Sequence, residues 1–357
     1  MKEKKKIKIG KYYIKNNRKR NYYLNLKDLE NNVLISGTTN TGKKIVSQKI
    51  LLDSHQIPFL LITMNNDFDI IKESLEDILI LKPGKNFSIN ILNSYRLKPC
   101  IYAQAIIKCL KNCNILESDI SPFSEYTLGR ILEKIYKNQN LQNFNSFNHI
   151  CTNFLNQKDK TTSMENVIED VRNAMKYFFT GNLKKVCIKN NRFDVKELFS
   201  KNIILDLSSI LDLGGNIKDI IIFLCILFRH IKDLKIVRSF TINERNIDHF
   251  TILDNAQKFR LDEMVHKNII IEYWEEFAFY LRRRGECLLT ITTEPIISKD
   301  ALCNNGVIIA FQHSIKNPML LEALNFKNGN EKSITSLHYG EFFIKTNSFP
   351  YPSLLNI

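Results

Sequence analysis

The sequence has no long hydrophobic run and no C-x-x-C pair. Its longest apolar run, "IIIFLCILF" at 220–228, is far too short to cross a bilayer. The first twenty residues are basic and have no apolar core, so no signal peptide is apparent. Cys109 and Cys113 lie four residues apart, but no second pair with zinc spacing follows, which favours free thiols in a reducing compartment. We therefore expect a cytoplasmic protein without a membrane span.

Acidic residues are scarce at the N-terminus. Residues 1–20 contain ten Lys or Arg residues and one acid, Glu3, in a chain whose net charge is +14. A basic arm suits a phosphate backbone, which makes DNA an expected partner. The alternative is a compositional bias, because Lys, Asn and Ile are abundant throughout the chain.

Buried strands are predicted where apolar, β-branched runs stand between polar segments. Five such runs are clear and two are weaker; they lie at 32–36, 58–63, 202–207, 250–254 and 287–293, and at 78–81 and 306–311. Continuous apolar runs indicate strands covered on both faces, as in a parallel sheet. Helical patterns at 43–54, 217–232 and 269–284 separate them. This alternation predicts a three-layer α/β fold.

The stretch from about 96 to 199 differs from the rest, because its patterns are helical and no strand is predicted there. It also contains polar segments at 138–149 and 156–162, which we expect to be loops. The predicted organisation is a basic N-terminal arm and lead-in strand at 1–30, an α/β core at 31–95 and 200–357, and a helical insertion at 96–199.

A complete G-x-x-x-x-G-K pattern follows the strand "VLIS" and precedes a helix. In that setting backbone N–H groups and the helix N-terminus surround phosphate oxygens, and the lysine reaches the β- and γ-phosphates. The pattern therefore predicts an ATP site, and its candidate residues are Gly37, Thr38, Asn40, Thr41, Gly42, Lys43 and Lys44. Lys44 stands where a Ser or Thr normally contacts magnesium. A lysine cannot ligate a cation and would repel one, so magnesium is the doubtful part of the prediction.

Two further segments carry candidate catalytic residues. Asp254 ends the strand at 250–254, and an aspartate at such a strand tip holds the magnesium of a bound nucleotide. The next position often carries a glutamate that activates water; here it is Asn255, whose amide can orient water but cannot accept its proton. Arg282 and Arg283 end a helix directly before a strand and are candidates for phosphate contact, including from a neighbouring subunit.

In combination these segments resemble the HerA–FtsK superfamily of ring-forming P-loop ATPases, and most closely its HerA-like DNA helicase/translocase branch. The resemblance covers roughly residues 8–357. It rests on segments in the expected order, namely "NNVLISGTTNTGKK" (31–44), "ILKPGKNFSINILN" (80–93), "ILDLSSI" (204–210), "LDNAQKF" (253–259), "LRRRG" (281–285), "ITTEP" (291–295) and "GEFFIKT" (340–346).

The resemblance implies a RecA-like P-loop NTPase core with a mainly parallel sheet and a helical insertion, assembled as a homo- or hetero-hexamer around DNA. It makes Lys43 the phosphate-binding lysine, Asp254 the magnesium aspartate, and Arg282, with Arg283, the arginine finger. We expect no N-terminal β-barrel, because only about 30 residues precede the phosphate loop.

Three positions depart from the family pattern. Lys44 replaces Ser or Thr, Asn255 replaces the catalytic Glu, and Thr293 replaces the sensor Gln. A catalytic base contributes roughly 10²–10⁴-fold to a rate, so hydrolysis is in doubt. Glu294 or Glu263 is an alternative source of a carboxylate.

The first functional hypothesis is an ATP-binding HerA-like DNA translocase, either with slow hydrolysis or as a pseudo-ATPase. The second is a catalytically degenerate subunit that pairs with a nuclease or an active ATPase paralogue. The third is a relative of type IV secretion or conjugation ATPases, which move DNA or protein.

Overall fold

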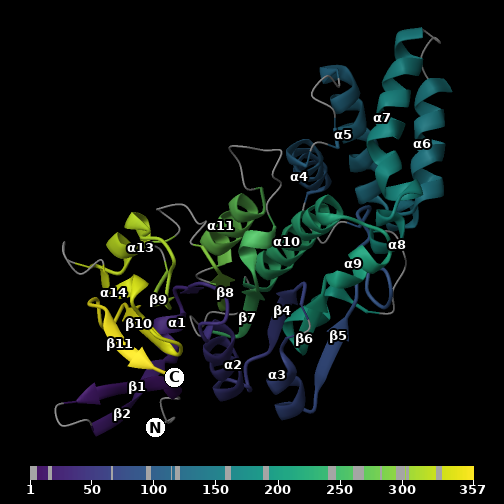
Figure 1. Ribbon diagram of the computed structural model, residues 1–357. Coiled ribbons are helices and arrows are strands. Elements are labelled where there is room, and N and C mark those ends of the chain that lie inside the picture. Colours follow the sequence, from purple (N-terminus) through teal and green to yellow (C-terminus); the bar gives the residue numbers. More distant parts are fainter. Residues whose placement is uncertain are drawn as a thin grey trace.

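The computed structural model describes most of the chain. The described residues are 6–14, 18–65, 67–93, 98–113, 115–116, 121–156, 162–187, 193–239, 247–259, 269–281, 284–294, 302, 305–326 and 332–357. Within them, one eleven-stranded sheet runs through the molecule in the order β2-β1-β11-β10-β9-β3-β8-β7-β4-β6-β5 (Figure 1).

The larger part of this sheet is parallel. Its strands are β3 (Val33–Ser36), β4 (Phe59–Thr63), β5 (Ile78–Leu81), β6 (Asn202–Asp206), β7 (His249–Leu253), β8 (Glu286–Thr292) and β9 (Val307–Ala310). All seven were predicted from their apolar runs, and their ends differ from the predicted ends by no more than one residue. The mainly parallel α/β fold is therefore confirmed.

The other part of the sheet is antiparallel and includes the N-terminal segment. Its strands are β1 (Lys6–Ile14), β2 (Arg18–Asn25), β10 (Glu341–Thr346) and β11 (Ser353–Asn356). Strand β1 pairs with both β2 and β11, and β10 pairs with β9. Much of the expected basic arm thus lies in a two-stranded ribbon at the sheet edge (Figure 1).

Alternation along each parallel strand explains why most of its length is apolar. The sheet separates two hydrophobic cores. In β4, Leu60 and Ile62 face the first core, and Phe59 and Leu61 face the second core. Side chains of successive strand residues point to opposite faces, so a strand covered on both sides is apolar throughout. All five residues of β4 are buried.

Helices cover both faces of the sheet (Figure 1). The helices on the face with the first core are α9 (Ser208–Asp212), α10 (Ile217–Ser239) and α11 (Ile269–Leu281). Those on the second are α2 (Lys43–Asp53) and α3 (Asp69–Ser74). Shorter elements complete the fold; they are α1 (Leu26–Leu29), η2 (Val195–Phe199), η3 (Ala256–Lys258), α13 (Pro318–Ala323) and α14 (Lys332–Thr335).

The described part of 98–187 is helical. It forms α4 (Pro99–Asn112), α5 (Pro122–Lys137), η1 (Gln139–Leu141), α6 (Phe144–Asn156), α7 (Thr162–Thr180) and α8 (Leu183–Cys187). The loop predicted at 138–149 was wrong, because α6 begins within it. The Asn-rich sequence of α6 has low helix propensity, but Phe147, Ile150, Cys151 and Phe154 have helical spacing and pack into the first core.

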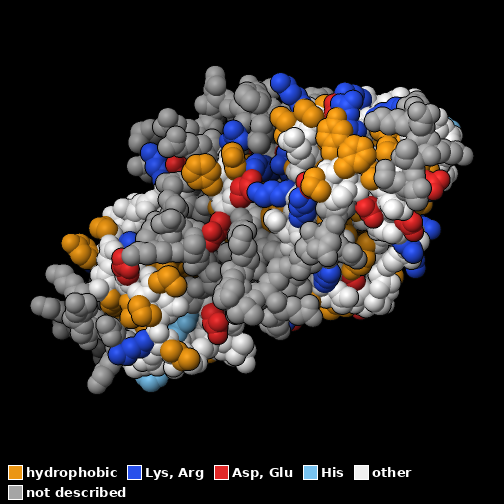
Figure 2. Space-filling view, turned by 90° about the horizontal axis from the view of Figure 1, so that it is seen from above, with side chains coloured by type: hydrophobic (Ala, Val, Ile, Leu, Met, Phe, Trp, Pro, Cys, Tyr) orange, Lys and Arg blue, Asp and Glu red, His pale blue; other side chains and the backbone are white. Residues whose placement is uncertain are grey.

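No helix in the described ranges is long and apolar enough to cross a membrane. Seen from above, hydrophobic side chains gather on the side where α4 to α7 lie, and Lys and Arg side chains form a group beside them (Figure 2).

Candidate nucleotide-binding site

The phosphate-loop sequence forms a tight turn between β3 and α2. Gly42 has φ 110°, a left-handed conformation that favours glycine. At Gly37 an added Cβ would lie 2.6 Å from the Cβ of Phe311. The amide of Thr38 donates to the carbonyl of Gln312 at 2.8 Å, and the hydroxyl of Thr41 donates to the carbonyl of Thr38 at 2.9 Å. The loop is therefore fixed against the end of β9 and has the expected strand–loop–helix setting.

Lys43 begins α2, and its side chain turns back over the loop. Its ammonium donates to the carbonyl oxygens of Gly37 and Thr38, both at 2.5 Å. Burial lowers the pKa of Lys43 to about 8; the carboxylate of Asp254 opposes this change, and the charge of Lys44 reinforces it. The partly desolvated cation has no carboxylate within ion-pair distance in the described structure, so a phosphate oxygen at this position would interact with it strongly.

Lys44 joins two acidic residues from different strand ends. Its Nζ lies 2.5 Å from Oδ2 of Asp67, which follows β4, and 3.8 Å from Oδ2 of Asp254, which follows β7. The ring of Phe68 lies 5.3 Å from the same Nζ. Lys44 therefore places a positive charge beside the aspartate that the sequence predicts to hold magnesium.

Asp254 is completely buried, and its Oδ2 atom accepts two hydrogen bonds. Oδ2 accepts from the hydroxyl of Thr63 at 3.0 Å and from the amide of Asn255 at 2.8 Å. The other oxygen, Oδ1, is buried and has no hydrogen-bond partner among the described residues. Burial raises the pKa of Asp254, although Lys44 and the Thr63 hydrogen bond oppose the change.

Magnesium fits this set of residues poorly. The free Oδ1 of Asp254 could ligate a cation. However, the position after Lys43 carries an ammonium instead of a hydroxyl, and that ammonium lies within ion-pair distance of Asp254. One carboxylate oxygen beside a fixed positive charge is a weak site for a hard divalent ion.

Asn255 connects the ends of β7 and β8. It has a left-handed backbone, with φ 53°. Its side-chain oxygen Oδ1 accepts from Nε2 of Gln257 at 3.3 Å, and Oε1 of Gln257 accepts from the main-chain amide of Thr293 at 3.2 Å. The three positions that depart from the family pattern, Lys44, Asn255 and Thr293, thus lie in one continuous set of contacts around Asp254.

The strands bearing the loop and the aspartate are not direct neighbours, since β8 lies between β3 and β7. Their ends still meet at one edge of the sheet. Arg282, Arg283 and Glu263 lie outside the described residues. Glu294 is exposed, and its main-chain amide donates to the hydroxyl of Thr292 at 3.2 Å.

Sequence reasoning missed Asp67, Thr63 and His313. Asp67 and Thr63 could have been found, because the rule that selected Asp254, a polar residue at the end of a buried strand, applies equally to β4. His313 lies just past β9, and its Nε2 is 3.1 Å from the hydroxyl of Ser36. Burial and the charge of Lys43 lower its pKa to about 4.

Comparison with solved structures identifies the class of fold. The chain is similar to VirB4 of Thermoanaerobacter pseudethanolicus, with a TM-score of 0.67 and 10% identity over 98% of this chain and 96% of that one. It is also similar to the bacterial conjugative coupling protein TrwB, with a TM-score of 0.62 and 9% identity over 94% of this chain and 86% of that one. The complex of TrwB with ADP and Mg²⁺ gives a TM-score of 0.60 at 10% identity, with 94% and 86% covered.

No protein-family model and no curated protein matches the sequence. The structural likeness establishes a RecA-like P-loop NTPase fold, the fold that the sequence predicted. It does not single out the HerA-like branch within the HerA–FtsK superfamily.

Proposed function

We propose that the protein is a nucleotide-binding P-loop protein of the HerA–FtsK superfamily, with ATP as its ligand and with weak or lost hydrolysis. The observation that carries the proposal is the position of Lys43, whose ammonium is held by the carbonyl oxygens of Gly37 and Thr38 at the start of α2. Loop amides, a helix N-terminus and this cation together form a phosphate site.

Weak hydrolysis follows from the surroundings of Asp254. Asn255 holds its amide against Oδ2 of Asp254, and an amide cannot take a proton from water. The ammonium of Lys44 supplies one positive charge near this edge of the sheet. We propose that this charge partly replaces magnesium, so that nucleotide binding does not depend on the metal.

A role in conjugation or type IV secretion is one of two biological settings that the structural neighbours support. The likeness to VirB4 extends over nearly the whole chain, and TrwB is a conjugative coupling protein. These neighbours support a relative of type IV secretion or conjugation ATPases at least as well as a HerA-like translocase. On either alternative we propose an oligomeric assembly that acts on DNA, with arginine fingers at Arg282 and Arg283.

Equilibrium binding of labelled ATP tests the proposed function. Lys43→Ala should weaken binding at least tenfold, about 1.4 kcal/mol, because it removes the cation nearest the phosphates. Lys49→Ala is the matched control, since Lys49 lies on the same helix, and it should bind as the wild type does. Equally poor binding by the wild type and by Lys43→Ala would show that the loop is vestigial.

A further inference from the structure

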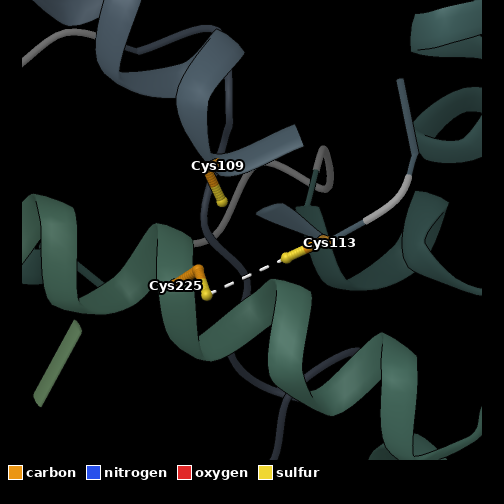
Figure 3. A group of neighbouring side chains, drawn as sticks. All are labelled: Cys109, Cys113 and Cys225. Atoms are coloured by element: carbon orange, nitrogen blue, oxygen red, sulfur yellow. Dashed lines mark hydrogen bonds between the residues drawn. The ribbon is translucent and has the colours of Figure 1, made fainter. Parts of the chain in front are cut away.

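Three cysteines from two helices meet in the interior, far from the phosphate loop in the sequence. Cys109 lies in α4, Cys113 caps the end of the same helix, and Cys225 lies in α10. Their sulfur atoms all lie within 4.8 Å of one another, and those of Cys113 and Cys225 are 4.0 Å apart. The three side chains are neighbours, and the dashed line joins the sulfur atoms of Cys113 and Cys225 (Figure 3). The sequence spacing pointed to Cys109 and Cys113 but not to Cys225.

The separation of these sulfur atoms fits a bound metal ion better than a disulfide. A zinc–sulfur bond of about 2.3 Å places two sulfur ligands about 3.8 Å apart in a tetrahedron and about 4.0 Å apart in a trigonal plane. A disulfide requires an S–S distance of about 2.05 Å and leaves the third thiol unused. Cys109 and Cys113 are four residues apart, so one helix face presents both, as two ligands of one ion require.

A cavity adjoins the cluster and leaves room for a fourth ligand. The cavity has a volume of about 180 Å³, and its wall includes Cys109, Cys225 and Tyr273 of α11. The phenol oxygen of Tyr273 is buried and has no hydrogen-bond partner among the described residues.

The charges around the cavity favour an anionic centre. Its wall also carries Lys108, Arg229 and Lys232. Lys232 pairs with Glu276 at 2.5 Å and Arg229 with Asp233 at 3.0 Å, which leaves one positive charge in excess beside the cluster. Three thiolates with one divalent ion have a net charge of about −1, and nearby cations stabilise it in a buried site.

We propose that Cys109, Cys113 and Cys225 form a binding site for a thiophilic divalent metal ion, Zn²⁺, with water or the Tyr273 phenol as the fourth ligand. Each thiol releases its proton to solvent as its sulfur binds the ion. The ion joins α4 of the helical segment to α10, which packs on the sheet, and so fixes these two parts to each other. This site is independent of the nucleotide site.

Metal uptake by the tag-free full-length chain tests the proposal. The protein is reduced, stripped with a chelator and titrated with Zn²⁺ alone or with Co²⁺, whose thiolate charge-transfer absorption reports sulfur ligation. The wild type should take up one ion per chain, with thiolate absorption in the cobalt form, and zinc should raise its unfolding temperature.

Variants separate this site from general effects of cysteine loss. Cys113→Ser and Cys225→Ser should each lose stoichiometric uptake, the thiolate absorption and the zinc-dependent stabilisation. Cys151→Ser is the matched control, because Cys151 is another buried cysteine, in α6, and it should retain all three. A folded, reduced wild type that takes up no zinc overturns the proposal. Unchanged uptake in Cys113→Ser, which alters only the residue that caps α4, also overturns it. A disulfide between Cys113 and Cys225 in protein prepared with zinc does the same.

Discussion

The ammonium of Lys44 lies 3.8 Å from the Oδ2 atom of Asp254, the aspartate that the sequence predicts to hold magnesium. Asp254 is completely buried, and in water-excluded surroundings a charge at this distance has a large effect. Asp67, on the other side of Lys44, holds the same ammonium at 2.5 Å. The two carboxylates therefore hold the Lys44 ammonium at this site, and the side chain does not extend into solvent.

The first prediction concerns metal dependence. The wild type should bind labelled ATP with the same affinity in magnesium and in EDTA, because Lys44 repels a divalent ion. Lys44→Thr restores the hydroxyl and removes the charge, so magnesium should increase the affinity of this variant about tenfold. Lys49→Thr, on the same helix, should behave as the wild type. Strong magnesium dependence in the wild type would contradict the role given to Lys44.

The second prediction concerns hydrolysis. Asn255→Glu should raise ATP turnover at least tenfold over the wild type, because it supplies the missing proton acceptor beside Asp254. Asn255→Gln is the matched control, because glutamine has the same size as glutamate but cannot accept a proton. Both residues must adopt the left-handed backbone of position 255, at φ 53°. Phosphate release at saturating ATP measures both variants. Equal rates for the Glu and Gln variants would show that the missing base is not what limits turnover.

The third prediction concerns DNA. Lys6, Lys11 and Arg20 are exposed on the β1–β2 ribbon. If they contact phosphates, replacing all three with Gln should reduce the slope of log affinity against log salt by about 2.7 for duplex DNA. A control variant replaces the exposed Lys134, Lys176 and Lys184 with Gln and should keep the wild-type slope. The same slope in both variants would show that the ribbon does not bind DNA.

The parallel strands were predictable because each is buried on both faces, which leaves a continuous apolar run such as "PFLLIT". The β1–β2 ribbon was not predicted in full, because its exposed positions alternate with core positions such as Ile7 and Ile9 and its charges dominate the composition. Helix α6 was missed because its Asn residues have low helix propensity, while tertiary packing of Phe147 and Ile150 decides its structure.

The residues of the candidate site were likewise predictable only in part. The phosphate loop and Asp254 follow from local rules that relate a strand end to the next residue. The pairing of Lys44 with Asp67 does not, because residues 23 positions apart meet only once the sheet order is known. The same holds for Cys225, which joins Cys109 and Cys113 only through the contact of α10 with α4.

The fourth prediction concerns pH. The pKa of His313 is lowered to about 4, whereas an unfolded histidine titrates near 6.5. The stability associated with this neutral imidazole is present above pH 6.5 and is lost as the pH falls toward 4, because the unfolded chain takes up the proton first. His313→Asn should therefore lose about 2 kcal/mol less than the wild type between pH 7 and pH 5. Urea unfolding measures the difference. The exposed His149→Asn should follow the wild type, and an identical loss in His313→Asn would contradict the assignment.

The fifth prediction concerns a buried ionic network at the opposite ends of the same strands. Oε1 of Glu286 lies 2.7 Å from His249 and accepts from Thr251, and Oε2 lies 3.0 Å from Lys235. Burial raises the pKa of Glu286, but the charges of His249 and Lys235 outweigh it and lower the pKa to about 2.

Glu286→Gln should cost about 3 kcal/mol of unfolding free energy, because it leaves the buried Lys235 with a weaker set of partners. ATP affinity should not change, since Glu286 begins β8 and the nucleotide site lies past its end, roughly 20 Å away along the strand. The exposed Glu169→Gln should alter neither quantity. A stable Glu286→Gln variant would show that Asp248, which also pairs with Lys235 at 2.6 Å, is sufficient to balance its charge.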